Sequence, residues 1–150
     1  MAIGQTKLDE LLKRGKLLKE LNAWKQSFDS ATKEQIIEWV QNDQLINKGV
    51  DGKGQVIGYY SLSTQQITNG RKKAGDKYNL KDTGDFFNSM KVSITNATIL
   101  IAGNGQKGAD NLYDKFGDYI TNLTDENIEK LKEIINEKYI EYVKKILLIN

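Results

Sequence analysis

The segment that closes the chain, residues 124–147, carries the pattern that most constrains the fold. Thr124 stands where a helix can begin, acids fill the early turns and lysines the last ones, which suits the helix dipole. Apolar residues recur at intervals of three and four and so share one helical face. The stripe is Ile128, Leu131, Ile135, Tyr139, Tyr142 and Ile146, widened by Ile134, Val143 and Leu147. We expect a long closing helix with this stripe buried.

The first 45 residues have the same periodicity. One amphipathic helix is predicted from Lys7 to Phe28, with an apolar stripe of Leu8, Leu11, Leu12, Leu17, Leu18, Leu21, Trp24 and Phe28. Asp29, Ser30 and Thr32 then supply a stop and a new N-cap. A second helix is predicted from about Lys33 to Leu45, burying Ile36, Ile37, Trp39 and Val40.

The middle of the chain is glycine-rich and then strand-like. Residues 47–61, NKGVDGKGQVIGYYS, hold four glycines and predict a loop with a brief extended piece near residues 55–59. Residues 63–73 predict a short polar helix, which Gly70 weakens by about 1 kcal/mol relative to alanine. Residues 90–95 alternate, with Met90, Val92 and Ile94 on one face, and Asn96-Ala97 separates them from TILIAG. Two such runs predict a β-hairpin.

These segments together predict an α+β fold: N-terminal helices, a small antiparallel β-hairpin or sheet, and a long C-terminal helix. At 150 residues the chain has the size of one ordinary domain. Its first ten residues hold no signal-peptide core, and no apolar run approaches the roughly 18 residues of a membrane span. We expect a single domain over residues 1–150, without membrane targeting.

The composition argues against most enzyme classes. The chain has no Cys and no His, so it lacks disulfides, thiolate metal sites, the usual general base near neutral pH and the commonest transition-metal ligand. The pairs Asp82/Asp85 and Asp110/Asp114 flank turn residues, where aspartate commonly caps or is solvated. We therefore predict no enzyme, with no catalytic residue, cofactor or metal ligand. A carboxylate or tyrosine site would be needed for the opposite interpretation.

Glycines 103, 105 and 108 have the G-x-G-x-x-G spacing of a dinucleotide-binding turn. Such a turn follows a parallel strand and opens a helix. Here the strand before Gly103 is expected to pair antiparallel with residues 90–95, and Gly117 comes too soon for a crossover helix. The spacing therefore predicts a mobile glycine-rich loop.

The charge of the chain is nearly balanced but unevenly placed. The net charge is +2, whereas residues 68–81 hold five bases against Asp76 alone. The run Arg71, Lys72 and Lys73 has two interpretations: a solvated helix end, or a patch that faces phosphate. No aromatic residue interleaves with the run, so base-specific readout is not supported.

Two aromatic doublets, Tyr59-Tyr60 and Phe86-Phe87, lie in segments that are short for burying both members of a pair. If Phe86 packs inward, we expect Phe87 to point elsewhere. Surplus aromatic residues can mark a protein interface, and close aromatics can also wrap a corner of the core. Both interpretations stay open.

Residues 80–92, LKDTGDFFNSMKV, resemble the signature of tailed-phage virion-morphogenesis proteins, also called neck, head–tail connector or tail-completion proteins. The pattern is a leucine, a Thr-Gly pair, a bulky apolar residue, a serine and then a strand, matched at Leu80, Thr83, Gly84, Phe86 or Phe87, Ser89 and Val92. We expect a tight turn at Thr83-Gly84 and a short helical turn capped by Asp85 or Thr83. Phe86 and Met90 would anchor that turn beneath a strand starting at Lys91.

The order of elements over residues 35–150 is also similar to that family. Phe116-Gly117 leads into the last helix, and GVDGKGQVIGYYS looks like versions found in phages of gut Bacteroidetes, including the crAss-like group. Many family members carry a Pro-Ala-Arg-Pro element before the last helix, where this chain reads TNLTDENIEK.

The resemblance implies a structural virion protein, made in the host bacterial cytoplasm and placed at the head–tail junction. It implies a ring of roughly 6 or 12 copies between the portal and adjacent ring or tail proteins, with phage double-stranded DNA passing non-specifically through the lumen. We expect subunit contacts at Tyr59, Tyr60, Phe87, Gly103, Gly105 and Gly108, and DNA-facing bases at Arg71, Lys72 and Lys73. The alternative is a small sequence-independent DNA-binding protein.

Overall fold

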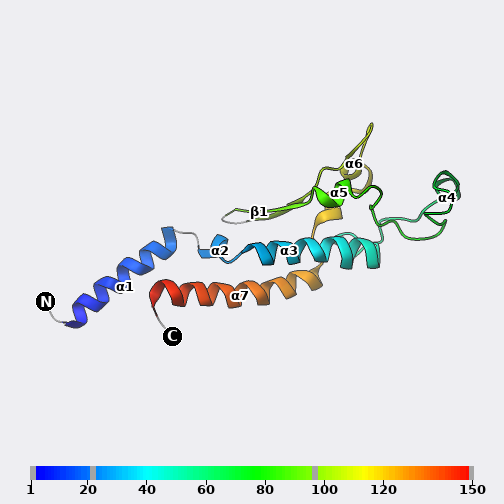
Figure 1. The fold of residues 1–150 in the computed structure, drawn as a ribbon. Helices are drawn as coiled ribbons and strands as arrows, with labels where there is room; N and C mark the ends of the chain where they lie inside the picture. The colour runs from blue at the N-terminus through cyan, green and yellow to red at the C-terminus, as the bar shows by residue number, and fades with distance from the viewer. Residues whose placement is uncertain (1–2, 21–22, 96–97, 149–150) are drawn as a thin grey trace.

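A computed structural model describes residues 3–20, 23–95 and 98–148 (Figure 1). Its helices are α1 (Ile3–Glu20), α2 (Ala23–Gln26), α3 (Ser30–Glu38), the π-helix η1 (Trp39–Lys48), α4 (Leu62–Ile67), α5 (Asp85–Asn88), α6 (Leu112–Phe116), the 3-10 helix η2 (Asp118–Thr121) and α7 (Asp125–Leu147). Its strands are β1 (Lys91–Ile94), β2 (Ile99–Ala102), β3 (Gln106–Lys107) and β4 (Asp110–Asn111). The predicted α+β class is confirmed.

The elements are arranged around one helical pair. Figure 1 shows α3 and η1 as a continuous rod beside α7, which runs in the opposite direction. The β1–β2 hairpin packs on α3 from the other side, while α1 contacts α7 and runs out past its C-terminal end. Ile36, Val40, Leu45 and Ile120 are fully buried where these layers meet.

The rod of α3 and η1 is longer than the expected helix of residues 33–45. Asp29 caps it, because its side chain accepts a hydrogen bond from the Thr32 N–H at 2.8 Å. From Trp39 the helix widens to π geometry and ends at Gly49, whose φ of 62° places it in the left-handed region. The Gly49 N–H donates to the Gln44 carbonyl. Ile36 and Val40 are buried as predicted, and Ile37 and Trp39 are half-buried.

The predicted hairpin is confirmed. β1 and β2 pair antiparallel in a register that joins Lys91 to Ala102 and Ile94 to Ile99. Met90, Ile94 and Ile101 face the core. The expected link at Asn96-Ala97 lies outside the described residues.

The glycine-rich middle follows the prediction more loosely. The segment before α4 forms isolated bridges, Val50 with Val56 and Tyr59 with Lys77, and no regular strand. The Ser61 side chain caps α4, which begins one residue earlier than predicted and ends at Ile67. Gly70 has a positive φ of 78°, so the predicted helix cannot continue through it.

The predicted single helix from Lys7 to Phe28 is wrong in two respects. The structure describes two separate helices, α1 and α2, and α1 leaves its leucines uncovered. Leu8, Leu11, Leu12 and Leu17 are 44–64% exposed, because α1 runs out past the C-terminal end of α7 and its contact with α7 leaves these side chains open. Leu21 and the side chain of Leu18 lie outside what the structure describes. Among the stripe side chains that the structure describes, only Phe28 is deeply buried.

Candidate interaction surface

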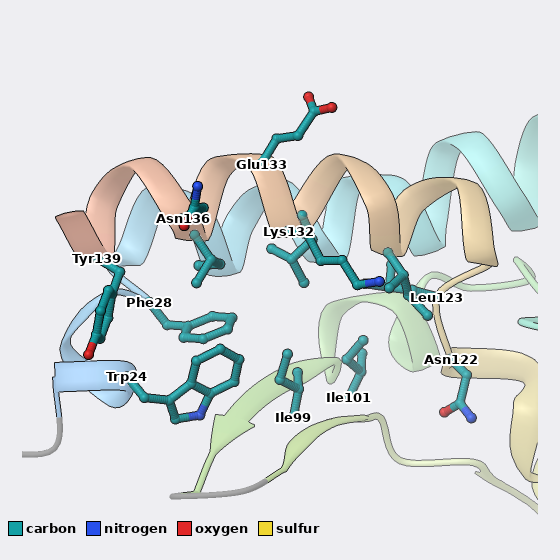
Figure 2. Close-up of a pocket in the computed structure, with 13 residues that line it drawn as sticks. Trp24, Phe28, Ile99, Ile101, Asn122, Leu123, Lys132, Glu133, Asn136 and Tyr139 are labelled. Atoms are coloured by element: carbon teal, nitrogen blue, oxygen red, sulfur yellow. The ribbon is translucent and has the colours of Figure 1, made fainter. Parts of the chain in front are cut away.

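The stripe on α7 is covered only in part. Leu131 and Ile135 are buried as predicted, but Ile128 and Tyr139 are 36% and 39% exposed. These four residues form one wall of an open groove of about 910 Å³ (Figure 2). The other side is formed by Ile99 and Ile101 of β2, by Trp24 of α2, and by Phe28, two residues after the end of α2.

Trp24 and Phe28 fix one end of the groove. Their rings meet edge to face, with centroids 4.8 Å apart and an interplanar angle of 73°. The Trp24 indole N–H donates to the Thr95 carbonyl at 3.2 Å, which ties α2 to the end of β1. This end of the groove is therefore held in place by contacts within the chain.

The rim of the groove is polar, with Asn122, Lys132, Glu133 and Asn136 around the opening. Figure 2 shows Lys132 extending along the edge and Glu133 pointing away from the opening. Lys132 pairs with Glu129 at 2.7 Å. An apolar floor with a polar rim is the composition of a protein-binding surface.

α1 presents a second apolar surface. Leu8, Leu11 and Leu12 are spaced three and four residues apart, so they share one face, and Leu12 is the most exposed of them at 64%. Gly15 continues this face, and an alanine methyl group placed there would meet nothing within 4 Å. Leu17 lies on the opposite side of the helix.

A buried polar link holds the start of α7 against η1. Gln44 is fully buried: its Oε1 accepts from the Thr124 N–H at 3.0 Å and from Asn127 Nδ2 at 2.9 Å, and its Nε2 donates to the Asn122 carbonyl at 2.8 Å. Asn127 Nδ2 also donates to Asp43, and this hydrogen bond is the largest cause that lowers the pKa of the Asp43 carboxyl. The link fixes the wall of the groove that α7 supplies.

The turn predicted at residues 83–90 forms, but the expected side-chain cap does not: Gly84 is the N-cap of α5 and has no side chain to accept a hydrogen bond. Gly84 has a φ of 93°, and the Thr83 hydroxyl donates to Asp85 at 2.7 Å at the start of α5. Phe86 and Met90 are buried under β1, which begins at Lys91. The Ser89 hydroxyl donates to the Phe86 carbonyl and accepts from the Asn104 N–H at 2.7 Å, so it joins α5 to the segment after β2. Leu80, at a φ of 59°, is half-buried against the core.

The aromatic doublets behave differently from each other. Phe86 and Phe87 are both buried, so the expectation that one of them points elsewhere is wrong: α5 is a single turn at a corner of the core, and the core wraps both rings. Tyr60 is also buried, against Tyr78, and burial is the largest cause that raises the pKa of its phenol. Tyr59 is 56% exposed. Of the predicted aromatic contacts, only Tyr59 offers an open side chain.

The glycine-rich segment 103–108 is more ordered than predicted. Gln106–Lys107 and Asp110–Asn111 pair as a small hairpin, and Gly108 turns at a φ of 61°. Gly103 and Gly105 are closely packed. A Cβ added at Gly103 would lie 3.0 Å from the Phe86 carbonyl oxygen, and one added at Gly105 would lie 2.7 Å from the Tyr113 ring. The strand before Gly103, β2, pairs antiparallel with β1 as predicted, whereas a dinucleotide-binding turn follows a parallel strand. Of these three glycines, only Gly108, at the tip of the hairpin, is exposed.

The basic run and the second hairpin meet at one carboxylate. Arg71 and Lys72 lie 3.5 Å and 3.8 Å from Asp82, and Lys107 also pairs with it. The Lys107 hydrogen bond is the largest cause that lowers the pKa of Asp82, while burial is the largest cause that lowers the pKa of Lys72. Lys73 is exposed beside this cluster. Three cations around one carboxylate leave a local positive surplus.

No protein-family model, curated protein or solved structure matches the chain. No helix within the described ranges is long and apolar enough to cross a membrane. The assignment of a function therefore rests on the residues and on the geometry given above.

The sequence predicted the apolar faces that line the groove but not the groove itself. Trp24, Ile135 and the β2 isoleucines each belong to a predicted apolar face, but these faces come from three segments far apart in the chain. The signal that was present is the width of the α7 stripe, which exceeds what one partner helix covers.

Proposed function

We propose that this chain is a structural virion protein that assembles with copies of itself into a ring at the portal–tail junction of a tailed phage. The observation that carries the proposal is the apolar surface left uncovered on the subunit: the groove beside α7 and the leucine face of α1. Exposed apolar areas of this kind are buried in assemblies.

The resemblance of residues 80–92 supports the choice of assembly. The turn at Thr83-Gly84, the buried Phe86 and Met90 and the link through Ser89 form one rigid corner between α5, β1 and the segment after β2. This corner positions β2, which supplies a wall of the groove. The module acts as scaffolding, and the proposal gives the chain no reaction and no cofactor.

The ring would let DNA pass without reading its sequence. Arg71, Lys72 and Lys107 form a positive cluster around Asp82, and the exposed Lys73 follows Lys72 in the chain. Bases of this kind contact phosphates by charge alone, and such contacts weaken steeply with salt. Tyr59 and Gly108, both exposed, remain as predicted contacts with neighbouring proteins.

The proposal is tested by the mass and shape of the purified chain. We expect sedimentation and negative-stain electron microscopy to show closed rings, and peptide mass spectrometry of purified phage particles to find the chain in many copies per portal. A chain that stays monomeric at every concentration and is absent from particles would contradict the proposal.

A small DNA-binding protein is the second candidate, and the cluster around Asp82 favours it. It predicts that the isolated subunit binds duplex DNA tightly at physiological salt, with affinity that falls steeply as salt rises. Replacing Arg71 and Lys72 by alanine would then remove most of the binding, whereas replacing Lys138, which pairs with Asp29 on another face, would not.

A further inference from the structure

We infer that the groove beside α7 receives α1 of a second copy of this chain. The inference rests on the proposed self-assembly and names the contact that produces it. Each subunit carries both halves of the contact: an open apolar groove, and an apolar helix face on which Leu8, Leu11 and Leu12 are 46–64% exposed.

The apolar face of α1 fits within the length of the groove. Ile128 and Tyr139 bound the groove along α7 and lie eleven residues apart, which is about 16 Å along a helix. The face of α1 extends from Leu8 to Gly15, about 10 Å. Gly15, on the face of Leu8 and Leu12, lets a second backbone approach closely because it has no side chain.

The two helices also carry net charges of opposite sign. Residues 3–20 hold five bases (Lys7, Lys13, Arg14, Lys16, Lys19) against three acids (Asp9, Glu10, Glu20), a net charge of +2. α7 holds six acids against five bases, a net charge of −1. This difference favours the approach of α1 to α7 of another copy over the approach of two α1 helices to each other.

The geometry of α1 makes the occupant a neighbour's helix. Figure 1 shows α1 of the same chain running past the C-terminal end of α7, away from β2 and from the groove. A contact between α1 and the groove joins two different patches, so each copy can bind one neighbour on either side. Such heterologous contacts generate rings when the rotation closes.

Disulfide trapping tests the contact, because the chain contains no cysteine of its own. One protein carries Leu12→Cys in α1, and a second carries Ile128→Cys or Tyr139→Cys in the groove. Any bond between the two proteins in a mixture is intermolecular. The matched control pairs Leu12→Cys with Ile67→Cys, since Ile67 is 82% exposed on α4, far from the groove.

We expect at least one groove position to cross-link with Leu12→Cys at least ten times more than the Ile67 control. Equal cross-linking at all three positions would overturn the inference. So would an intrachain bond as the main product when both cysteines are placed in one chain. Rings that form without the specific cross-link would sink this inference and leave the proposed function standing, whereas a monomer at every concentration would sink the proposed function.

A second variant keeps the test independent of cysteine chemistry. Leu12→Lys places a charge in the proposed contact, and Ile67→Lys places one at an exposed apolar side chain on α4, far from the groove. We expect Leu12→Lys to raise the subunit concentration needed for assembly at least tenfold and Ile67→Lys to leave it unchanged. Circular dichroism of both variants shows whether the fold is intact. Equal effects, or none, would count against the inference.

Discussion

The helices at the two ends of the chain, α1 and α7, share the same spacing of apolar residues but differ in what surrounds them. Both carry leucines and isoleucines three and four residues apart, and both mix acids with lysines on the remaining faces. In α7, Leu131 and Ile135 are buried in the hydrophobic core, and Asn127 is held by the Gln44 link. In α1, Leu8, Leu11 and Leu12 are open to solvent.

This difference teaches that an amphipathic pattern predicts an apolar face but does not identify what covers it. The cover of α7 comes from a rod, a hairpin and a polar link within the same subunit. The part of the chain that the structure describes leaves Leu8, Leu11 and Leu12 of α1 exposed, and we have proposed that a neighbour covers them. Single substitutions test this difference through their effect on the free energy of unfolding.

The sharpest test replaces one leucine in each helix by alanine. Leu131→Ala removes a side chain that is 4% exposed, and we expect a loss of about 2–5 kcal/mol in the free energy of unfolding from the cavity it leaves. Leu12→Ala should cost less than about 0.5 kcal/mol, because Leu12 is 64% exposed. Chemical denaturation of dilute subunits measures both. Similar losses would erase the difference between the helices.

The polar link of α7 gives the next largest effect. Gln44→Met keeps the length of the side chain and removes the partners of the Thr124 N–H, the Asn122 carbonyl and Asn127. We expect a loss of about 2 kcal/mol, since buried polar groups would be left unpaired. The control is Gln66→Met, an exposed glutamine on α4 that should change stability little. Denaturation curves that coincide for the two variants would show that the link does not hold α7.

The cap of α3 gives a smaller effect. Asp29→Ala removes the acceptor for the Thr32 N–H and the ion pair with Lys138 of α7, and should cost about 1 kcal/mol. Asp29→Asn keeps an N-cap acceptor and loses only the charge, so it should recover most of the loss. Thermal unfolding of both variants checks this order, and the reverse order would contradict the capping role.

The charge of Asp29 also predicts a dependence on pH. The hydrogen bond from Lys138, followed by that from the Thr32 N–H, lowers the pKa of Asp29 to about 2 from a usual value of 3.8. A lowered pKa means that the stabilisation is fully present above pH 4 and disappears as pH falls towards 2. Because the side chain is 52% exposed, solvent screening limits it to less than about 1 kcal/mol. The difference in unfolding free energy between wild type and Asp29→Asn should shrink over that range, and a difference that stays constant would argue against the ion pair.

Much of the fold was predictable from local chemistry. The caps at Asp29 and Thr124, the β1–β2 hairpin and the turn at Thr83-Gly84 each depend on residues close in sequence, and each forms as expected. The π-helix was not predictable, because the same residues favour α and π geometry alike and only tertiary packing, here the burial of Gln44, separates them.

The candidate site was less predictable. Phe87 was expected to point outward because its segment is short for burying both rings, but the single turn of α5 lies in a corner that buries both. Gly103 and Gly105 were interpreted as loop glycines, whereas they leave room for Phe86 and Tyr113. The groove joins Trp24, Ile99 and Ile128, and no local pattern relates segments so far apart.

The most direct measurement of the central claim is an electron microscopy map of the assembled protein at side-chain resolution. The account predicts that α1 of one subunit lies along α7 of the next, with Leu8, Leu11 and Leu12 between Tyr139 and the β2 isoleucines. Subunits joined through other surfaces, with α1 free or folded onto its own chain, would contradict it.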